Sequence, residues 1–153
     1  MFFTFLSIIV PLVIYLLLPI VVQVVTGKPL KRDSLLLIAC LCYFISWYLP
    51  SPLIHGQDTS FTTHVIGGGV FSGFLWLYLK RQLSWKLSWS EEMMSLYAFV
   101  CAFGVAYELF ELLISELHLV RINGADTWWD LLANTLGAFV FWIGYRIAQK
   151  IRR

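Results

Sequence analysis

Five long apolar segments, separated by short polar stretches, run along this 153-residue chain. A transmembrane helix needs roughly 20 mostly apolar residues, and lengths of about 17–25 are tolerated. Each segment fits or nearly fits that length, and the prolines in the first segment can be accommodated as kinks. The pattern predicts an all-α, polytopic membrane helix bundle that forms a single domain over residues 1–153. The expected spans are about 2–25, 34–50, 61–79, 91–115 and 127–148.

Two of the predicted helices begin with residues that favour a helix N-terminus. Asp33 or Ser34 offers a side-chain acceptor before the second segment, and Ser90 does so before the fourth. Glu91 and Glu92 follow Ser90 in the first turn, where the helix dipole stabilises acidic side chains. These residues predict where the second and fourth helices start.

The composition changes the expected solvent from water to lipid. Hydrophobic residues make up 59% of the chain and charged residues 13%, whereas soluble domains have about 45–50% and about 25%. A globule of this size could not bury so much apolar side chain. The composition excludes a soluble enzyme, a nucleic-acid-binding protein and a disordered chain. The cysteines lie inside apolar segments without a Cys-x-x-Cys pair, so we expect them to have no disulfide or metal role.

The basic residues predict the orientation of the bundle. Only Arg121 falls between the fourth and fifth segments, and the other ten of the eleven Lys and Arg residues follow the first and third segments or close and follow the fifth. Basic residues collect on the cytoplasmic side of a membrane. We therefore expect the N-terminus outside, the C-terminus in the cytoplasm, and a multi-pass protein of the cell inner (cytoplasmic) membrane.

Acidic residues gather at the opposite, outer end of the last two predicted helices. Glu108 and Glu111 share a helix face in the fourth span, about 10 Å and 6 Å below its outer end. Asp126, Asp130 and Asn134 share a face of the fifth span. Asp130 and Asn134 lie about 5 Å and 11 Å below its start. The two helices therefore present polar groups at matching depths.

The third span brings a histidine to the same end. His64 lies at the outer mouth of this span, and Gly67, Gly68, Gly69 and Gly73 follow it. A glycine face lets helices approach closely, so we expect this span to be the central helix. We interpret the glycine run as a packing feature rather than a phosphate loop, because it does not follow a strand.

The chemistry of these polar residues favours a cation. An ionised carboxylate is costly inside a bilayer, and no Lys or Arg lies in the outer half of any span. We therefore expect a metal ion, a proton or a cationic substrate among the acids. Carboxylates with imidazole suit Mn, Fe or Zn, and an oxygen-only set suits Mg or Ca. The expected metal ligands are His64, Glu108, Glu111, Asp126 and Asp130. The catalytic candidates are Glu108, Glu111 and Asp130, and the residues expected to orient the ligands are Asn134 and Asp58.

Each of these residues also has a structural interpretation. Asp126 and Asp130 can cap the fifth helix, because the sequence from 127 to 130 has the spacing of a capping box. Asn134 can hydrogen-bond a neighbouring helix, and His64 can be an interfacial residue at a helix start. The two glutamates of the fourth span can form a protonated, hydrogen-bonded pair. A solvated side chain is ordinary for Asp58, which lies in a loop.

Two motifs in the second half of the chain resemble a known family. Residues 106–111 read Ala-Tyr-Glu-Leu-Phe-Glu, and residues 126–130 read Asp-Thr-Trp-Trp-Asp. They look like the Tyr-Glu-x-x-Glu and Asp-Thr-x-x-Asp motifs of the YjdF-like family of bacterial inner-membrane proteins. Asp58 and His64 resemble that family's upstream Asp and His, at a wider spacing. The last helices resemble VanZ-like membrane proteins more loosely. Since VanZ-like members are linked to tolerance of a glycopeptide antibiotic, the resemblance implies a role with envelope lipids.

Three functional hypotheses follow from the sequence. The leading one is an outward-facing, metal-binding acidic site that acts on a lipid-linked or envelope substrate, as a metal-dependent membrane hydrolase would. The second is a small proton- or cation-coupled transporter, although transport sites usually lie near the midplane. The third is a structural subunit whose acids hold the helices together. The expected partners are the lipid bilayer, a lipid-linked substrate and, because five short helices make a thin bundle, a second copy of the chain.

Overall fold

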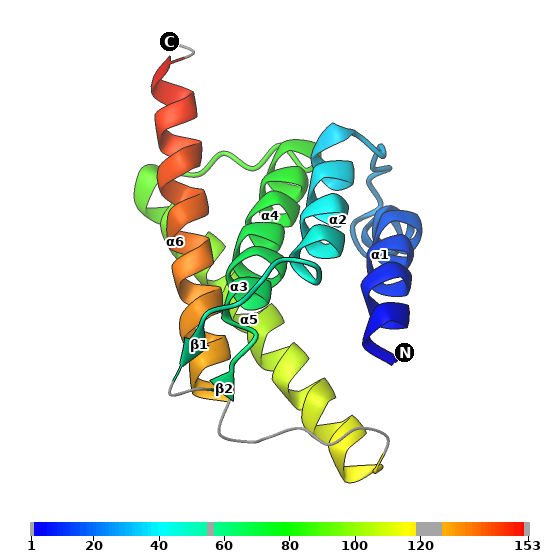
Figure 1. Ribbon diagram of the computed structural model, residues 1–153. Coiled ribbons are helices and arrows are strands. Elements are labelled where there is room, and N and C mark those ends of the chain that lie inside the picture. The colour runs from blue at the N-terminus through cyan, green and yellow to red at the C-terminus, as the bar shows by residue number, and fades with distance from the viewer. Residues whose placement is uncertain (1, 55–56, 119–126, 152–153) are drawn as a thin grey trace.

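The chain folds into five helical rods, shown in a computed structural model that describes residues 2–54, 57–118 and 127–151 (Figure 1). The third rod has three consecutive parts, and a two-residue hairpin of β1 and β2 precedes it. The predicted all-α class is confirmed, and each predicted segment corresponds to one rod. The elements are α1 (Phe2–Thr26), α2 (Ser34–Ser46), β1 (Leu53–Ile54), β2 (Gln57–Asp58), α3 (Phe61–Thr63), η1 (His64–Val70), α4 (Phe71–Gln82), α5 (Trp89–Glu116) and α6 (Thr127–Ile151).

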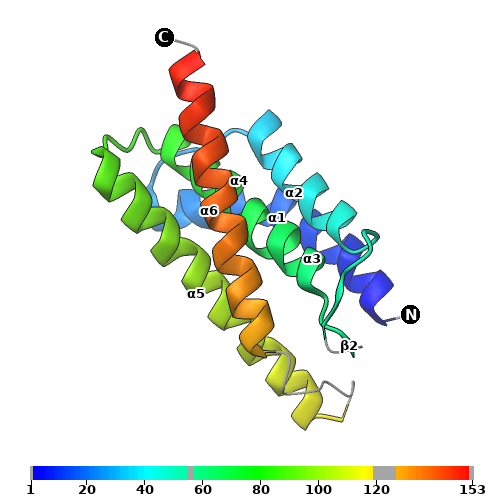
Figure 2. The same cartoon turned by 60° about the vertical axis from the view of Figure 1, so that its left-hand side comes forward.

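The third rod lies at the centre of the bundle, as its glycines predict. η1 packs most extensively on α6, and α4 packs on α2 and α5. α1 lies at the edge of the bundle beside α2, and α5 crosses α6 with its C-terminal end extending beyond the start of α6 (Figure 2). One apolar cluster joins α1, α2 and α4, and its fully buried members include Leu36, Leu75 and Tyr78. A second joins α4, α5 and α6 around Trp76 and Leu96.

Glycines bring the backbones of η1 and α6 into direct contact. A Cβ atom added to Gly69 would lie 2.5 Å from the Cα of Gly137 and 2.5 Å from the carbonyl oxygen of Asn134. No side chain fits at such a distance, so only glycine permits this approach. η1 itself is a π-helix, a conformation the sequence pattern does not predict. Three consecutive glycines make it accessible, because glycine restricts the backbone least, and π-turns are often found at functional sites.

The predicted helix starts are half correct. Asp33 is the N-cap of α2, and its side chain accepts hydrogen bonds from the backbone of Leu35 and Leu36. For α5, the prediction of Ser90 is wrong, because the helix begins at Trp89 and Ser88 is its N-cap. The reason is a capping box: Ser88 is followed three positions later by Glu91, whose carboxylate accepts from the backbone N–H of Ser88. Three residues after Ser90 comes a methionine, which cannot close that box.

A basic side chain compensates for a proline inside α1. Pro19 has no N–H, so it leaves the carbonyl of Tyr15, four residues earlier, without its usual helical donor. The guanidinium of Arg32 donates to that carbonyl at 3.1 Å and to the neighbouring carbonyl of Leu16 at 2.9 Å. Both prolines lie within one continuous helix, as the sequence predicts, and Arg32 compensates for the second of them.

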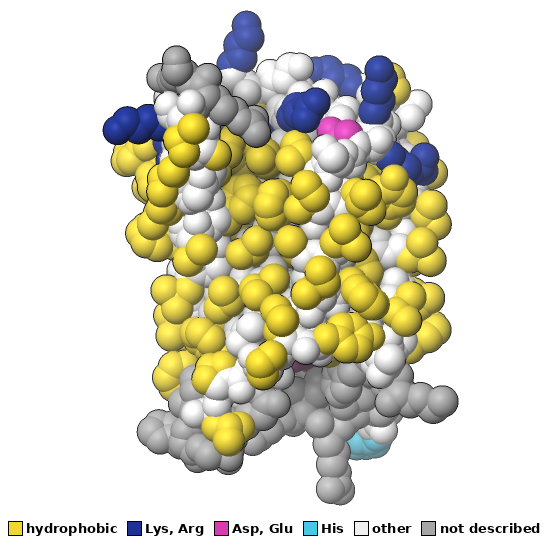
Figure 3. All heavy atoms as spheres, turned by 45° about the horizontal axis from the view of Figure 1, so that its top comes forward, with side chains coloured by type: hydrophobic (Ala, Val, Ile, Leu, Met, Phe, Trp, Pro, Cys, Tyr) yellow, Lys and Arg dark blue, Asp and Glu magenta, His cyan; other side chains and the backbone are white. Residues whose placement is uncertain are grey.

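The surface carries the features of a protein that sits in a bilayer. Within the described part of the chain, three helices are long and apolar enough to cross a membrane: Thr4–Thr26, Trp89–Glu116 and Trp128–Ile151. Apolar side chains cover a broad band of the face seen in Figure 3, and Lys and Arg side chains gather at one end of it. The exposed apolar residues include Ile8, Leu109 and Val140. Large exposed apolar surfaces of this kind mark membrane or protein contacts.

Candidate metal centre

Three side chains with metal-binding atoms converge at one end of the bundle. His64 is the first residue of η1, Glu108 lies near the C-terminal end of α5, and Asp130 lies in the first turn of α6. Each offers one ligand atom, and the three atoms all lie within 4.8 Å of one another. His64 and Asp130 are buried, with 8% and 3% of their surface exposed, and Glu108 is half-buried. Three separate rods therefore contribute to a single group.

The close packing of η1 on α6 brings His64 to Asp130. The Nε2 atom of His64 lies 3.2 Å from a carboxylate oxygen of Asp130. One turn further along α6, the Asn134 side chain is buried beside His64 and against Gly68. A Cβ atom on Gly68 would overlap the side-chain oxygen of Asn134. The glycine run thus has two effects. It lets the two backbones approach, and its missing side chains leave space for the Asn134 side chain beside His64.

α5 completes the group with a glutamate and a tyrosine. The ring of Tyr107 meets that of His64 edge-on, with centroids 5.7 Å apart. Glu111 lies near the hydroxyl groups of Tyr107 and of Tyr43. It is therefore a neighbour of the group through a tyrosine, while Glu108 belongs to the group itself. The spacing of the two glutamates places them on the same helix face, but their positions relative to the group differ.

The structure brings together some of the predicted site residues and does not describe others. His64, Glu108 and Asp130 form the group, Asn134 supports it, and Glu111 lies beside it. Asp126, predicted as a ligand or a helix cap, lies outside the described residues. Asp58 lies in β2, and its orienting role stays a prediction. The catalytic and metal-binding roles of all these residues are likewise predictions.

The spacing of the group is close to what a divalent cation requires. Nitrogen and oxygen ligands lie about 2.0–2.2 Å from zinc, so two ligands of a tetrahedral ion are about 3.3–3.6 Å apart. The three atoms lie within 4.8 Å of one another, so side-chain rotations that move them by about 1 Å would bring them to that distance. Three protein ligands with a fourth position open is the pattern of catalytic zinc sites. α5 contains no Lys or Arg, and those of α6 begin at Arg146, near its other end. Neither helix therefore places a basic side chain at the open ligand position.

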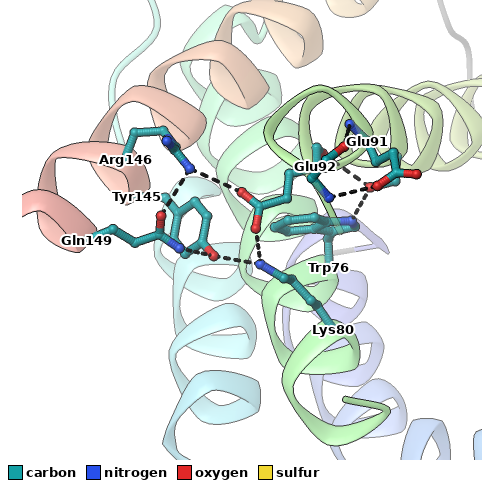
Figure 4. A network of polar contacts seen from close by, with 9 residues as sticks. Trp76, Lys80, Glu91, Glu92, Tyr145, Arg146 and Gln149 are labelled. Carbon is teal, nitrogen blue, oxygen red and sulfur yellow. Dashed lines mark hydrogen bonds and ion pairs between the residues drawn. The ribbon is translucent and has the colours of Figure 1, made fainter. Parts of the chain in front are cut away.

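A second polar cluster, which the sequence analysis does not predict, lies at the basic end of the bundle (Figure 4). Glu92 is buried, with 6% of its surface exposed, between the ammonium of Lys80 and the guanidinium of Arg146. Lys80 also donates to the hydroxyl of Tyr145 at 2.8 Å. These hydrogen bonds to Glu92 and Tyr145 compensate for the burial of the Lys80 ammonium. The cluster ties α4, α5 and α6 together.

A signal for this basic-end cluster was present in the sequence. Lys80, Glu92 and Arg146 all lie near the inner ends of three predicted spans, and so at a similar depth. The sequence pattern by itself indicates only that Glu92 is an acid in the first turn of its helix. Its burial depends on the rotation of α5 toward α4 and α6, which depth alone does not specify.

Comparison with known proteins does not assign the chain to a family. No known protein family matches the chain, and no curated protein or solved structure is significantly similar to it. The resemblance of its motifs to the YjdF-like and VanZ-like proteins therefore stays a prediction.

Proposed function

We propose that this chain is a multi-pass protein of the bacterial inner membrane that binds a divalent metal ion at the outer end of its bundle and acts there on a lipid-linked or envelope substrate. The convergence of His64, Glu108 and Asp130 within 4.8 Å carries the proposal. Three ligands drawn from three rods make a site that exists only in the folded bundle. Ionisable residues inside membrane segments are costly and usually functional.

The distribution of charge supports the proposed orientation. Lys80 and Arg81 lie in the last turn of α4, and Lys150 lies in the last turn of α6. His64 and Lys80 lie in the same third rod, 16 residues apart, so the basic end is roughly 24 Å from the acidic group at about 1.5 Å per residue. Because basic residues collect in the cytoplasm, the acidic group faces outward. The third rod, residues 61–82, is long enough to span the bilayer alongside the three longer apolar helices.

The residues of the group can divide the work of a hydrolysis. The buried pair His64 and Asp130 would hold the ion, with Glu108 as the third ligand. A bound divalent ion lowers the pKa of a coordinated water and polarises a phosphoryl or carbonyl oxygen. Glu111, half-buried beside Tyr107, is placed to accept a proton at the edge of the group. Asn134 would orient His64 from below, as outer residues around metal ligands do.

The metal content of the purified protein tests this proposal. We expect about one equivalent of a divalent ion in tag-free wild-type protein and its loss in Asp130→Asn. Glu116→Gln is the matched control, because Glu116 is an exposed acid at the end of the same α5 helix, and it should retain the ion. Equal and negligible metal in all three proteins would contradict a metal site.

A structural role for the same residues is the second candidate. The 3.2 Å contact between His64 and Asp130 and the burial of Asn134 against Gly68 favour it, since such contacts hold α6 on η1 without any ion. In that case Asp130→Asn should lower the melting temperature equally in the presence and in the absence of a chelator. With a metal site, chelation should lower the melting temperature of the wild-type protein and leave that of Asp130→Asn unchanged.

The transporter hypothesis has less support from the arrangement. The group lies at the outer end of the third rod, whereas transport sites usually lie near the midplane. Below it, the core between α4, α5 and α6 is apolar, with Val100, Ala138 and Phe141 buried there. Proton or cation flux in proteoliposomes that is lost in Glu108→Gln would revive this alternative.

A further inference from the structure

A cavity of about 340 Å³ lies beside the acidic group, and its chemistry differs from one end to the other. At one end it meets His64, Tyr107 and Asn134. Its remaining walls are mostly apolar, with Leu6 and Val10 from α1 on one side and Phe103 and Phe110 from α5 on the other. Small-molecule sites commonly have such a volume, with apolar walls and a few convergent polar groups.

The cavity is elongated along the axis of the bundle. Its lining residues on α5 run from Val100 to Phe110, which corresponds to about 15 Å at about 1.5 Å per residue. On α1 they run from Leu6 to Ile14, or about 12 Å. A space of this shape fits an extended chain better than a compact solute.

The cavity lies between residues of α1 and residues of α5. Within the described residues, α1 packs extensively only against α2, so it leaves a gap toward α5. Phe103 and Phe110 line the cavity and are 40% and 42% exposed. This gap lies between two of the helices that are long and apolar enough to cross a membrane. What enters through it comes from the hydrocarbon layer.

We propose that this cavity binds one acyl chain of a membrane phospholipid, with the lipid headgroup held at the His64–Glu108–Asp130 group. The proposal rests on the function proposed above and names the substrate class of that site. An apolar space open to the bilayer is filled by hydrocarbon, because polar groups and water are costly there. The chain alone gives little selectivity, since lipid tails are as apolar as the side chains of the walls. The polar end supplies the selectivity, because a metal ion there attracts the negative phosphate of the headgroup.

Photo-crosslinking in a bilayer tests where the acyl chain lies. The full chain, loaded with Zn²⁺, is reconstituted in vesicles of phosphatidylethanolamine and phosphatidylglycerol that include phosphatidylglycerol with a diazirine in its acyl chain. After illumination, mass spectrometry locates the labelled peptides. We expect severalfold more label on the peptides that contain Val10 and Phe103 than on the peptide that contains Phe139 and Val140, which are exposed on the surface of α6. Equal labelling of these surfaces would overturn the proposal.

Two matched pairs of variants give the test its controls. Ala106 lines the cavity, whereas Ala102 is equally exposed on α5 and lies outside the lining. We expect Ala106→Trp to reduce the labelling of the cavity severalfold and Ala102→Trp to leave it unchanged. On α1, Val10→Trp and Val13→Trp form the same pair, since Val13 is exposed and outside the lining. If both cavity-filling variants keep the wild-type labelling, the proposal is wrong. If either fails to fold by circular dichroism, the other pair and the wild-type labelling pattern decide.

The metal content separates this inference from the proposed function. Asp130→Asn that loses the ion but keeps cavity labelling would show an acyl-chain site without the lipid headgroup at the metal, and would overturn the headgroup part of the proposal. Uniform labelling in a protein that does bind metal would overturn the acyl-chain site and leave the metal centre intact. Loss of both the ion and the label in Asp130→Asn, with both retained in Glu116→Gln, is the expected result.

Discussion

Glu108 and Glu111 lie three positions apart on α5, and Glu108 is the one that belongs to the group of possible ligand atoms with His64 and Asp130. Positions three apart differ by about 60° around a helix with 3.6 residues per turn. That rotation is enough to move Glu111 toward Tyr107 and Tyr43. At the scale of a residue, depth and side-chain type made both glutamates candidates, and the direction of each side chain separates them.

This separation predicts different consequences for two conservative variants. Glu108→Gln removes a ligand, so we expect it to weaken metal binding by more than about 100-fold. Glu111→Gln removes a neighbour of the ligands, and changes of that kind typically cost about 10–100-fold. Competition with a fluorescent zinc chelator measures both affinities. If Glu111→Gln weakens binding more than Glu108→Gln does, the assignment of the ligands is wrong.

At the scale of elements, the contact between η1 and α6 depends on glycine. A Cβ atom on Gly69 would meet the backbone of α6, which cannot yield as a side chain can. We expect Gly69→Ala to lower the free energy of unfolding by about 1–3 kcal/mol, the usual cost of overpacking. Gly144→Ala is the control, because nothing lies within 4 Å of a Cβ atom there, and it should stabilise α6 by about 0.5–1 kcal/mol.

Reversible unfolding in mixed detergent micelles measures both glycine variants. A Gly69→Ala protein as stable as the wild type would show that η1 and α6 can move apart without cost. The close packing of η1 on α6 would then contribute less to stability than the structure indicates.

The cluster at the basic end gives a second prediction about elements. The side chains of Glu92 and Lys80 are 8% and 14% exposed, and removing one partner of a buried ion pair typically costs about 3–5 kcal/mol. We therefore expect Glu92→Gln to destabilise the protein strongly, because the largely buried ammonium of Lys80 would lose its carboxylate. Glu91→Gln, at an exposed neighbouring position, should have a much smaller effect.

A double variant distinguishes the loss of attraction from the cost of an unpaired charge. Replacing both partners of a buried pair by apolar residues is often neutral. Lys80→Met combined with Glu92→Leu should therefore be more stable than Glu92→Leu alone in the same unfolding assay. If the two single effects add instead, Lys80 and Glu92 do not form a coupled pair.

At the scale of the whole molecule, one end of the bundle is basic and the other carries the acidic group. The proposed orientation can be tested with single cysteines introduced into a chain whose native cysteines are replaced by serine. Glu116 is exposed at the C-terminal end of α5, and Ser84 is exposed in the loop that joins α4 to the other end of α5. We expect a membrane-impermeant maleimide to label Glu116→Cys in intact cells, and to label Ser84→Cys only after the cells are permeabilised. The reverse pattern would place the acidic group in the cytoplasm and remove the proposed function.

The whole-molecule features were predictable to different degrees. Five rods and the central place of the third follow from local patterns: long apolar runs, short polar breaks and a glycine face. The lateral cavity does not follow from them, because it arises where α1 packs on α2 and leaves a gap toward α5. Whether two helices leave space between them depends on packing over the whole bundle, so the sequence of a single segment does not predict the cavity.

The sequence by itself determined the rods, the basic end and the short list of polar residues at the other end. These features depend on composition and on spacing along one helix, which sets both depth and face. The tertiary structure alone decided that His64, Glu108 and Asp130 meet, that Glu111 lies beside this group next to Tyr107, and that Glu92 is buried among basic groups. The physical reason is that a helix can rotate about its axis without changing its pattern, and only packing against its neighbours selects the rotation.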